Sequence, residues 1–93
     1  MRRIEKRMIN AIYHGKDWKE NNTEVRITHE GETAKVYLHG NRIAKVDLGT
    51  VIPDIRTFSR WPTATTCSRL RALGIRCKSG NKPELFDLRA PFP

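Results

Sequence analysis

Between residues 23 and 48 the apolar side chains fall at every second position, and this alternation constrains the fold more than any other feature. Three stretches show it, and a glycine separates each from the next. A period of two is typical of strands with one buried and one solvated face. We therefore expect three strands, over 23–28, 34–39 and 43–48, with a glycine-first hairpin turn at Gly40-Asn41. Strands joined by short turns form an antiparallel meander.

Two other segments carry apolar residues at helical spacing. In residues 2–14 the apolar stripe runs from Ile4 to Ile12, and Gly15 follows where a helix C-cap is usual. In residues 63–73, threonines suited to N-capping precede a stripe made by Cys67, Leu70 and Leu73. Both segments are predicted to be amphipathic helices.

Shorter segments complete the predicted fold. Residues 16–22 form a polar connector that Trp18 anchors, and Pro53-Asp54 forms a turn. Ile55–Trp61 is predicted to be a fourth strand, which ends at Pro62. Two short strands, at Ile75–Lys78 and Glu84–Leu88, form a C-terminal hairpin, and the proline-rich tail 90–93 is predicted to be irregular.

These elements predict an α+β fold. A small antiparallel sheet, made of the meander plus the C-terminal hairpin, packs against two amphipathic helices, because so thin a sheet needs a second layer. The 93 residues fit a single domain, 1–93, with loose termini at 1–3 and 89–93. We expect a monomer or a dimer.

Three segments occur in an order that resembles a known group of proteins. They are Asn22-Thr23-Glu24-Val25, then Leu38-His39-Gly40-Asn41-Arg42-Ile43-Ala44, then Trp61-Pro62-Thr63-Ala64-Thr65-Thr66-Cys67-Ser68-Arg69-Leu70-Arg71-Ala72-Leu73. They are similar to the NTxV, LHGNxIA and W-x-T-x-TT-x-x-RL-x-AL segments of short proteins encoded by bacteriophages and prophages. The resemblance covers roughly residues 5 to 88 and implies a phage origin and a common fold. It brings no catalytic residues.

The charge of the chain limits its partners. Lys and Arg number 18 against 10 Asp and Glu, which gives a net charge of +8. Such a charge speeds encounter with polyanions, and nucleic acid is the first partner class that it favours. An acidic host protein is the second. A third interpretation is that the charge only keeps a small protein soluble.

Cysteine content and the N-terminal sequence indicate the compartment. The chain has two cysteines, Cys67 and Cys77, too few for a typical disulfide-rich secreted domain, although a bridge between them is chemically possible. No apolar run follows Met1-Arg2-Arg3, and no stretch reaches the ~20 apolar residues that span a bilayer. We expect reduced thiols, no membrane partner and a cytoplasmic location, within the host bacterial cell if the phage resemblance holds.

Catalytic and metal-binding patterns are weak. Cys67 begins a predicted helix, where a thiolate is favoured, but its place in the apolar stripe predicts a buried structural residue. His29 and His39 can approach across the hairpin, yet two ligands do not make a structural zinc site. The carboxylates are isolated beside Lys or Arg. We therefore expect no enzyme activity, no cofactor, no metal and no small-molecule substrate.

Basic residues in the second half are the one feature that suggests a site. On the predicted fourth strand Arg56, Phe58 and Arg60 share one side, so that two guanidinium groups flank a ring able to stack on a base. On the following helix, Arg69 and Arg71 are expected to face away from the apolar stripe. The candidate nucleic-acid-binding residues are Arg56, Phe58, Arg60, Trp61, Arg69, Arg71, Arg76 and Lys78. The alternative is that Phe58 is a core residue and the arginines are solvated surface.

Two functions fit these observations. The first is a phage accessory protein that binds nucleic acid non-catalytically, mainly through phosphate contacts. The alternative is a phage host-takeover protein that binds and inhibits a host bacterial protein through its basic face. Both rely on a basic surface, so the sequence separates them poorly.

Overall fold

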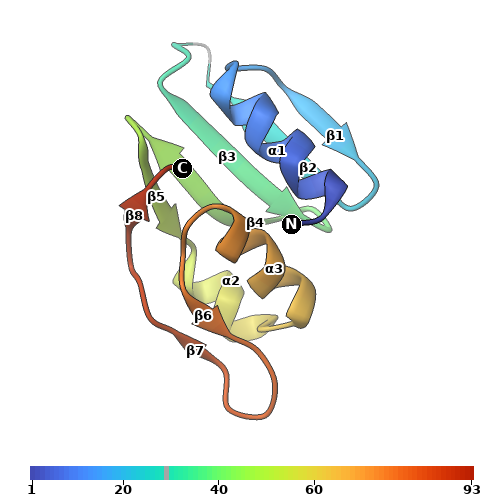
Figure 1. Cartoon of the computed structure of the whole chain (residues 1–93), viewed down its shortest axis with the longest axis vertical. Helices are drawn as coiled ribbons and strands as arrows, with labels where there is room; N and C mark the ends of the chain where they lie inside the picture. Colours follow the sequence, from blue (N-terminus) through green and yellow to red (C-terminus); the bar gives the residue numbers. More distant parts are fainter. Residues whose placement is uncertain (29) are drawn as a thin grey trace.

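The computed structural model describes residues 1–28 and 30–93 of the chain and shows an α+β fold (Figure 1). In chain order the elements are α1 (Arg3–Tyr13), β1 (Trp18–Glu20), β2 (Thr23–Ile27), β3 (Thr33–Leu38), β4 (Asn41–Asp47), β5 (Thr50–Pro53), α2 (Ile55–Arg60), α3 (Ala64–Ala72), β6 (Cys77–Lys78), β7 (Glu84–Leu85) and β8 (Ala90–Pro91). The predicted fold class is confirmed.

Two antiparallel sheets carry the architecture. The larger sheet has six strands in the order β1-β2-β3-β4-β5-β8, so its first five strands follow chain order as the predicted meander does. The smaller sheet pairs β6 with β7, which corresponds to the predicted C-terminal hairpin. His29, and with it the predicted approach of His29 to His39, lies outside the described residues.

The β3–β4 hairpin turns one residue earlier than predicted. Leu38 pairs with Asn41, so the turn residues are His39 and Gly40, with φ of 52° and 79°. Positive φ at both central positions defines a type I′ turn, whose twist matches that of the flanking strands. The prediction of a Gly40-Asn41 turn was wrong because Asn41 already belongs to the β4 ladder.

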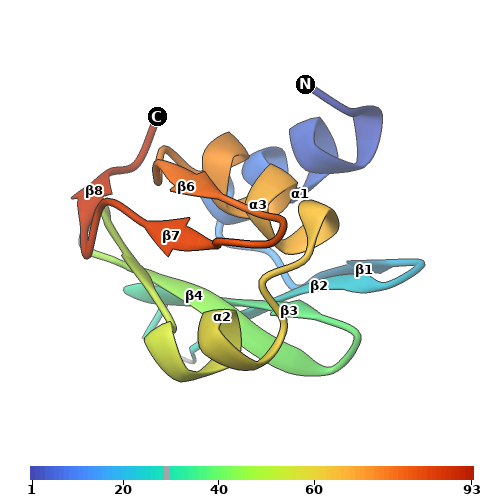
Figure 2. The same cartoon turned by 90° about the horizontal axis from the view of Figure 1, so that it is seen from below.

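The helices α1 and α3 cover one side of the large sheet. Figure 2 shows α1, α3 and the β6–β7 hairpin on the same side of strands β1 to β4. The core lies between these layers, and the largest fully buried side chains include Met8, Ile43, Leu70, Leu73 and Ile75. The expected inward faces of β2 and β3 are confirmed, since Val25 and Val36 have no exposed surface.

The segment predicted as a fourth strand is the helix α2. Pro53 is the last residue of β5, and the carboxylate of Asp54 then accepts a hydrogen bond from the backbone N–H of Thr57 at 3.0 Å. An aspartate in this position satisfies an N–H group that the first turn of a helix leaves free. The Pro53-Asp54 pair therefore starts a helix, and the strand prediction for Ile55–Trp61 was wrong.

Three short strands were also missed. β1 lies within the predicted connector, β5 includes part of a predicted turn, and β8 lies in the tail predicted to be irregular and loose. Pro91 fits a strand here because β8 is at the sheet edge, where no further strand requires its missing N–H group. Leu48, predicted as the last residue of the third strand, lies in the β4–β5 turn and is 77% exposed.

Candidate nucleic-acid interface

The side of the sheet away from α1 and α3 carries a row of cations. Register places Arg26 opposite Lys35 and Lys35 opposite Lys45, on the adjacent strands β2, β3 and β4. These residues alternate with the buried positions of the same strands, so all three point away from the core. Neighbouring strands lie roughly 5 Å apart, which sets the spacing along the row.

The two lysines of this row lack counter-charges. Among residues 1–28 and 30–93, neither Lys35 nor Lys45 has an ion-pair or hydrogen-bond partner for its ammonium group. Like charges directly opposite each other on a sheet are destabilising. The two ammonium groups therefore repel each other, while the carboxylates of Glu24 and Asp47 occupy neighbouring positions on the same face.

An aromatic ring lies beside the row. The Arg26 guanidinium stands over the ring of Tyr37, 4.5 Å from its centroid, and also pairs with Glu24 at 2.7 Å. The hydrogen bond from Arg26 lowers the pKa of Glu24, so both groups are charged at neutral pH. The Tyr37 ring is thus held in place beside the cations.

A β-bulge brings one more arginine to this side. The register shifts after Val36, so that Tyr37 pairs with Arg42 while Ile43 and Ala44 are both buried. A bulge inserts one extra residue into a strand, so the alternation of side chains shifts by one position. As a result Arg42 points to the same side as Lys45. We call the surface formed by Arg26, Lys35, Tyr37, Arg42, Lys45 and Arg56 the open face.

Arg56 joins the open face from α2. A hollow of about 240 Å³ is lined by Arg42, Lys45 and Arg56, together with Ile55 and Asp54. Asp54 accepts from Arg42 at 3.3 Å. Burial alone raises the pKa of Asp54, but hydrogen bonds from Thr57 and Arg42 outweigh it and hold this pKa below its usual range. Of the predicted site residues, Arg56 is the one that adjoins this row of cations.

Trp61 lines a second hollow, and Arg60 lies over its ring. The Trp61 side chain is 43% exposed, and the Arg60 guanidinium lies 5.9 Å from its ring centroid. The hollow, about 360 Å³, is also lined by His39 and Asn41 from the β3–β4 hairpin and by threonines at the start of α3. We call it the Trp61 pocket.

Two predicted site residues belong to the interior. Phe58 is 6% exposed and forms part of the core, so the alternative interpretation of this residue is confirmed. Arg69 is 3% exposed, with its guanidinium 2.8 Å from the carboxylate of Glu5 and its Nε donating to Thr23 Oγ1 at 3.0 Å. The expected exposure of Arg69 was wrong because α3 packs against α1 as well as against the sheet.

The remaining predicted residues lie around the small sheet. Arg71 donates two hydrogen bonds to the carbonyl oxygen of Cys77, at 3.1 and 2.8 Å. Arg76 pairs with Asp87 at 3.0 Å, and Lys78 is exposed on β6. The eight predicted residues are therefore distributed over several places and do not form one surface.

Sequence reasoning missed five residues of the open face: Arg26, Lys35, Tyr37, Arg42 and Lys45. For all but Arg42, which the bulge directs outward, the signal was present, since they occupy the polar positions of the same alternation that predicts the strands. The higher density of arginine in the second half of the chain predicted a site there instead. The pairing register between the strands decides whether these positions form one row, and that register depends on the turn residues.

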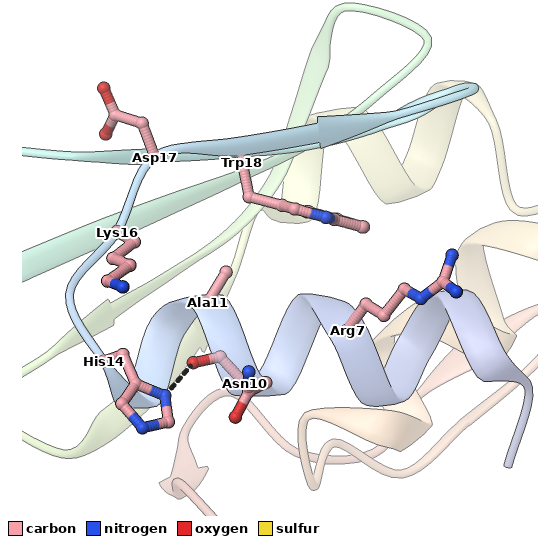
Figure 3. A pocket seen from close by; sticks show the side chains of 7 residues that line it. All are labelled: Arg7, Asn10, Ala11, His14, Lys16, Asp17 and Trp18. Carbon is pink, nitrogen blue, oxygen red and sulfur yellow. Dashed lines mark hydrogen bonds between the residues drawn. The ribbon is translucent and has the colours of Figure 1, made fainter.

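A further hollow, about 340 Å³ in volume, lies between α1 and β1 (Figure 3). Most of its polar groups already have partners. Arg7 pairs with Glu20 at 2.6 Å, and the His14 ring hydrogen-bonds to the Asn10 carbonyl at 2.9 Å. In Figure 3 the Asp17 carboxylate points away from α1, and it accepts from the backbone N–H of Ile27. We interpret this hollow as the boundary between the packed elements α1 and β1.

The cysteines lie in the core. Both Cys67 and Cys77 are buried free thiols, and the Cys77 Sγ lies 3.7 Å from the carbonyl oxygen of Cys67. Burial, together with the neighbouring Cys67, raises the pKa of the Cys77 thiol to about 12. A neutral thiol is a poor nucleophile and a poor metal ligand.

The described residues also bear on metal sites and on membrane-spanning helices. Within 1–28 and 30–93, no three His, Cys, Asp or Glu side chains come together as a metal site would require. In the same residues, every helix is too short or too polar to cross a membrane.

The fold and the open face define a small two-layer α+β protein whose sheet is basic on its uncovered side. The chain belongs to the family described as Kyanoviridae Gp96 protein, whose model matches residues 1–86. It is therefore a phage protein, as the resemblance implied. No curated protein and no solved structure matches it.

Proposed function

We propose that this phage protein binds nucleic acid non-catalytically, in the cytoplasm of the host bacterium, through the open face. The observation that carries the proposal is the row formed by Arg26, Lys35 and Lys45. Lys35 and Lys45 face each other without an ion-pair partner in the described residues, and a phosphate backbone laid across them neutralises both.

The chemistry of the open face suits a nucleic-acid backbone. Ammonium and guanidinium groups at strand spacing contact phosphate oxygens, which position the nucleic acid without reading its sequence. Tyr37 offers a ring for stacking, and the Arg26 guanidinium beside it adds a second flat cationic surface. We expect affinity to fall steeply with salt and to vary little with sequence.

The test uses two double variants with equal charge. K35T/K45T removes the central pair, and threonine keeps a good strand propensity. K78T/K82T removes two exposed lysines near the small sheet and is the matched control, because each double takes two charges from the net +8. The measurement is fluorescence anisotropy of a labelled oligonucleotide titrated with protein at several salt concentrations.

K35T/K45T is expected to bind about tenfold more weakly and to lower the salt slope by about two, one for each lost phosphate contact. K78T/K82T is expected to change affinity much less. Equal losses in the two doubles would mean that net charge alone matters. Absence of binding by the parent protein at low salt would overturn the proposed function itself.

An acidic host protein is a second candidate partner, and one observation favours it. Ile55 is 53% exposed and lines the same hollow as Arg42 and Arg56. An apolar residue surrounded by charged ones resembles the centre of a protein interface. A pull-down at physiological salt with nuclease, comparing the parent with I55D, separates the candidates. A host protein that survives nuclease and is lost with I55D favours the second one.

A further inference from the structure

The Trp61 pocket is formed where two motif segments, far apart in the sequence, meet. His39, Asn41 and Ile43 come from the Leu38–Ala44 segment, and Trp61, Thr63 and Thr65 come from the segment that starts at Trp61. The space between them is about 360 Å³, which is within the range of small-ligand sites.

The lining of this pocket has an aromatic wall and an apolar floor. Trp61 is 43% exposed, although it directly follows a helix and could have packed inside. Ile43, which lies in the floor, is 2% exposed and belongs to the core. An exposed indole over buried aliphatic carbon gives a flat ring a surface on which to stack.

Polar groups at the rim have free hydrogen-bonding capacity. In the described part of the chain, the His39 ring and the Thr65 hydroxyl have no hydrogen-bond partner, and Asn41 uses its amide nitrogen in one long bond of 3.4 Å to the His39 carbonyl. An amide presents donors and an acceptor side by side, which matches the edge of a nucleobase.

The pocket and the open face meet at α2. Thr57 lines the pocket while its neighbour Arg56 belongs to the open face. Asn41 and Arg42 are successive residues of β4 and point to opposite sides of the sheet, so the pocket lies on the side of α3. A single strand that follows the cations of the open face therefore has to pass α2 to reach the pocket. Arg60, over the Trp61 ring, adds a cation beside the pocket.

We propose that the Trp61 pocket binds one unpaired base of a single-stranded nucleic acid whose backbone lies on the open face. This inference rests on the proposed function. A base within a duplex is stacked and paired, so it reaches a pocket only after unpairing. The pocket thereby gives preference to single strands over duplexes.

The experiment compares two probes of equal charge. One is an oligothymidylate of about 12 nucleotides, within the usual length range of single-strand sites, and the other is an abasic strand of the same length. The parent protein is expected to bind the base-containing strand about tenfold more tightly. W61L is expected to lose most of this preference and to keep only the part that stacking on Tyr37 supplies, and W61F to retain most of it because it keeps an aromatic ring.

A second measurement leaves Trp61 unchanged and therefore does not depend on how W61L folds. Since the chain has two tryptophans, W18F makes Trp61 the sole indole fluorophore. Its emission is expected to be quenched by the oligothymidylate and not by the abasic strand.

The outcomes separate the two proposals. If the parent binds both strands equally, or W61L keeps the whole preference, no base occupies this pocket and the inference is wrong, while nucleic-acid binding still stands. If neither strand binds at low salt, the proposed function fails and the inference fails with it. Equal quenching by both strands also contradicts the inference.

Discussion

The guanidinium of Arg69 lies 2.8 Å from the carboxylate of Glu5, and each side chain is only 3% exposed. This ion pair joins α1 to α3 across 64 residues of sequence. Arg69 also donates to Thr23 and, at 3.5 Å, to Asn22, so the first and third motif segments meet at this one side chain. Every buried side-chain polar atom in the described residues has a partner.

Breaking this pair is expected to destabilise the protein strongly. E5Q removes the counter-charge and leaves the Arg69 guanidinium buried, which costs about 3–5 kcal/mol in comparable sites. The matched control is E20Q, which breaks the exposed pair with Arg7 and should cost at most about 1 kcal/mol. Urea unfolding measures both free energies. Similar losses in the two variants would mean that Arg69 does not depend on Glu5.

The same pair predicts a pH dependence. Burial alone raises the pKa of Glu5, but hydrogen bonds from Ser68, Arg69 and the Arg2 backbone, with the charge of Arg69, hold it below 4.5. Because the folded-state pKa lies below the unfolded one, Glu5 contributes its full stability above about pH 4.5 and loses it as the pH falls through the folded value.

Urea unfolding of the parent and E5Q between pH 7 and pH 3 tests this expectation. The difference between their free energies of unfolding should shrink as the pH falls below about 4.5. The lowered pKa values of Asp54 and Asp87 affect both proteins alike and cancel in the difference. A constant difference across this range would contradict the assignment to Glu5.

The sequence predicts the parts of this fold that are local. The strands β2 to β4 were predictable because each has one solvated face, so the alternation of side chains is visible. The helix α2 was not predictable, because a helix of six residues with one buried side chain, Phe58, is too short to show a helical period in its apolar residues. Its signal was the capping residue Asp54, which a reading by period alone overlooks.

The candidate site was predictable only in part. Arg56, Arg60 and Trp61, named as candidates from the sequence, are exposed, but the surfaces they join depend on β4 and on the β3–β4 hairpin. Arg69 was assigned to the surface because its partner Glu5 is distant in sequence. A buried arginine is rare unless it is paired, and such a pairing cannot be read from one segment.

Leu48 offers a route to a more stable protein. It has a φ of 49° and precedes Gly49 at 79°, so the pair forms a type I′ turn with an exposed leucine in its first central position. Leucine is disfavoured in this left-handed conformation, whereas asparagine adopts it readily. L48N is expected to raise the free energy of unfolding by about 1 kcal/mol.

L48A is the control for that change, because alanine also removes the exposed apolar side chain but does not favour positive φ. It should give little or no gain in urea unfolding. An equal gain from L48A would attribute the effect to the loss of the exposed side chain, and a loss of stability in L48N would show that Leu48 makes a stabilising contact.

Asp54 links the stability of α2 to the charge of the open face. Its Oδ1 caps the Thr57 N–H, while its Oδ2 accepts from Arg42. D54A loses both roles and is expected to lower the free energy of unfolding by about 0.5–2 kcal/mol.

Asparagine caps a helix about as well as aspartate, so D54N is expected to unfold like the parent while it releases Arg42. If the open face binds nucleic acid, D54N should bind an oligonucleotide about threefold more tightly, with a salt slope steeper by about one.

The control for D54N is D87N, which makes the same change of charge beside Arg76, at the small sheet. Anisotropy titrations at matched salt compare the two variants. The larger gain in D54N is expected because Arg42 lies next to Lys45 and opposite Tyr37, whereas Arg76 is remote from the row of cations. Equal gains would mean that only net charge governs binding, and a gain confined to D87N would move the interface to the β6–β7 hairpin.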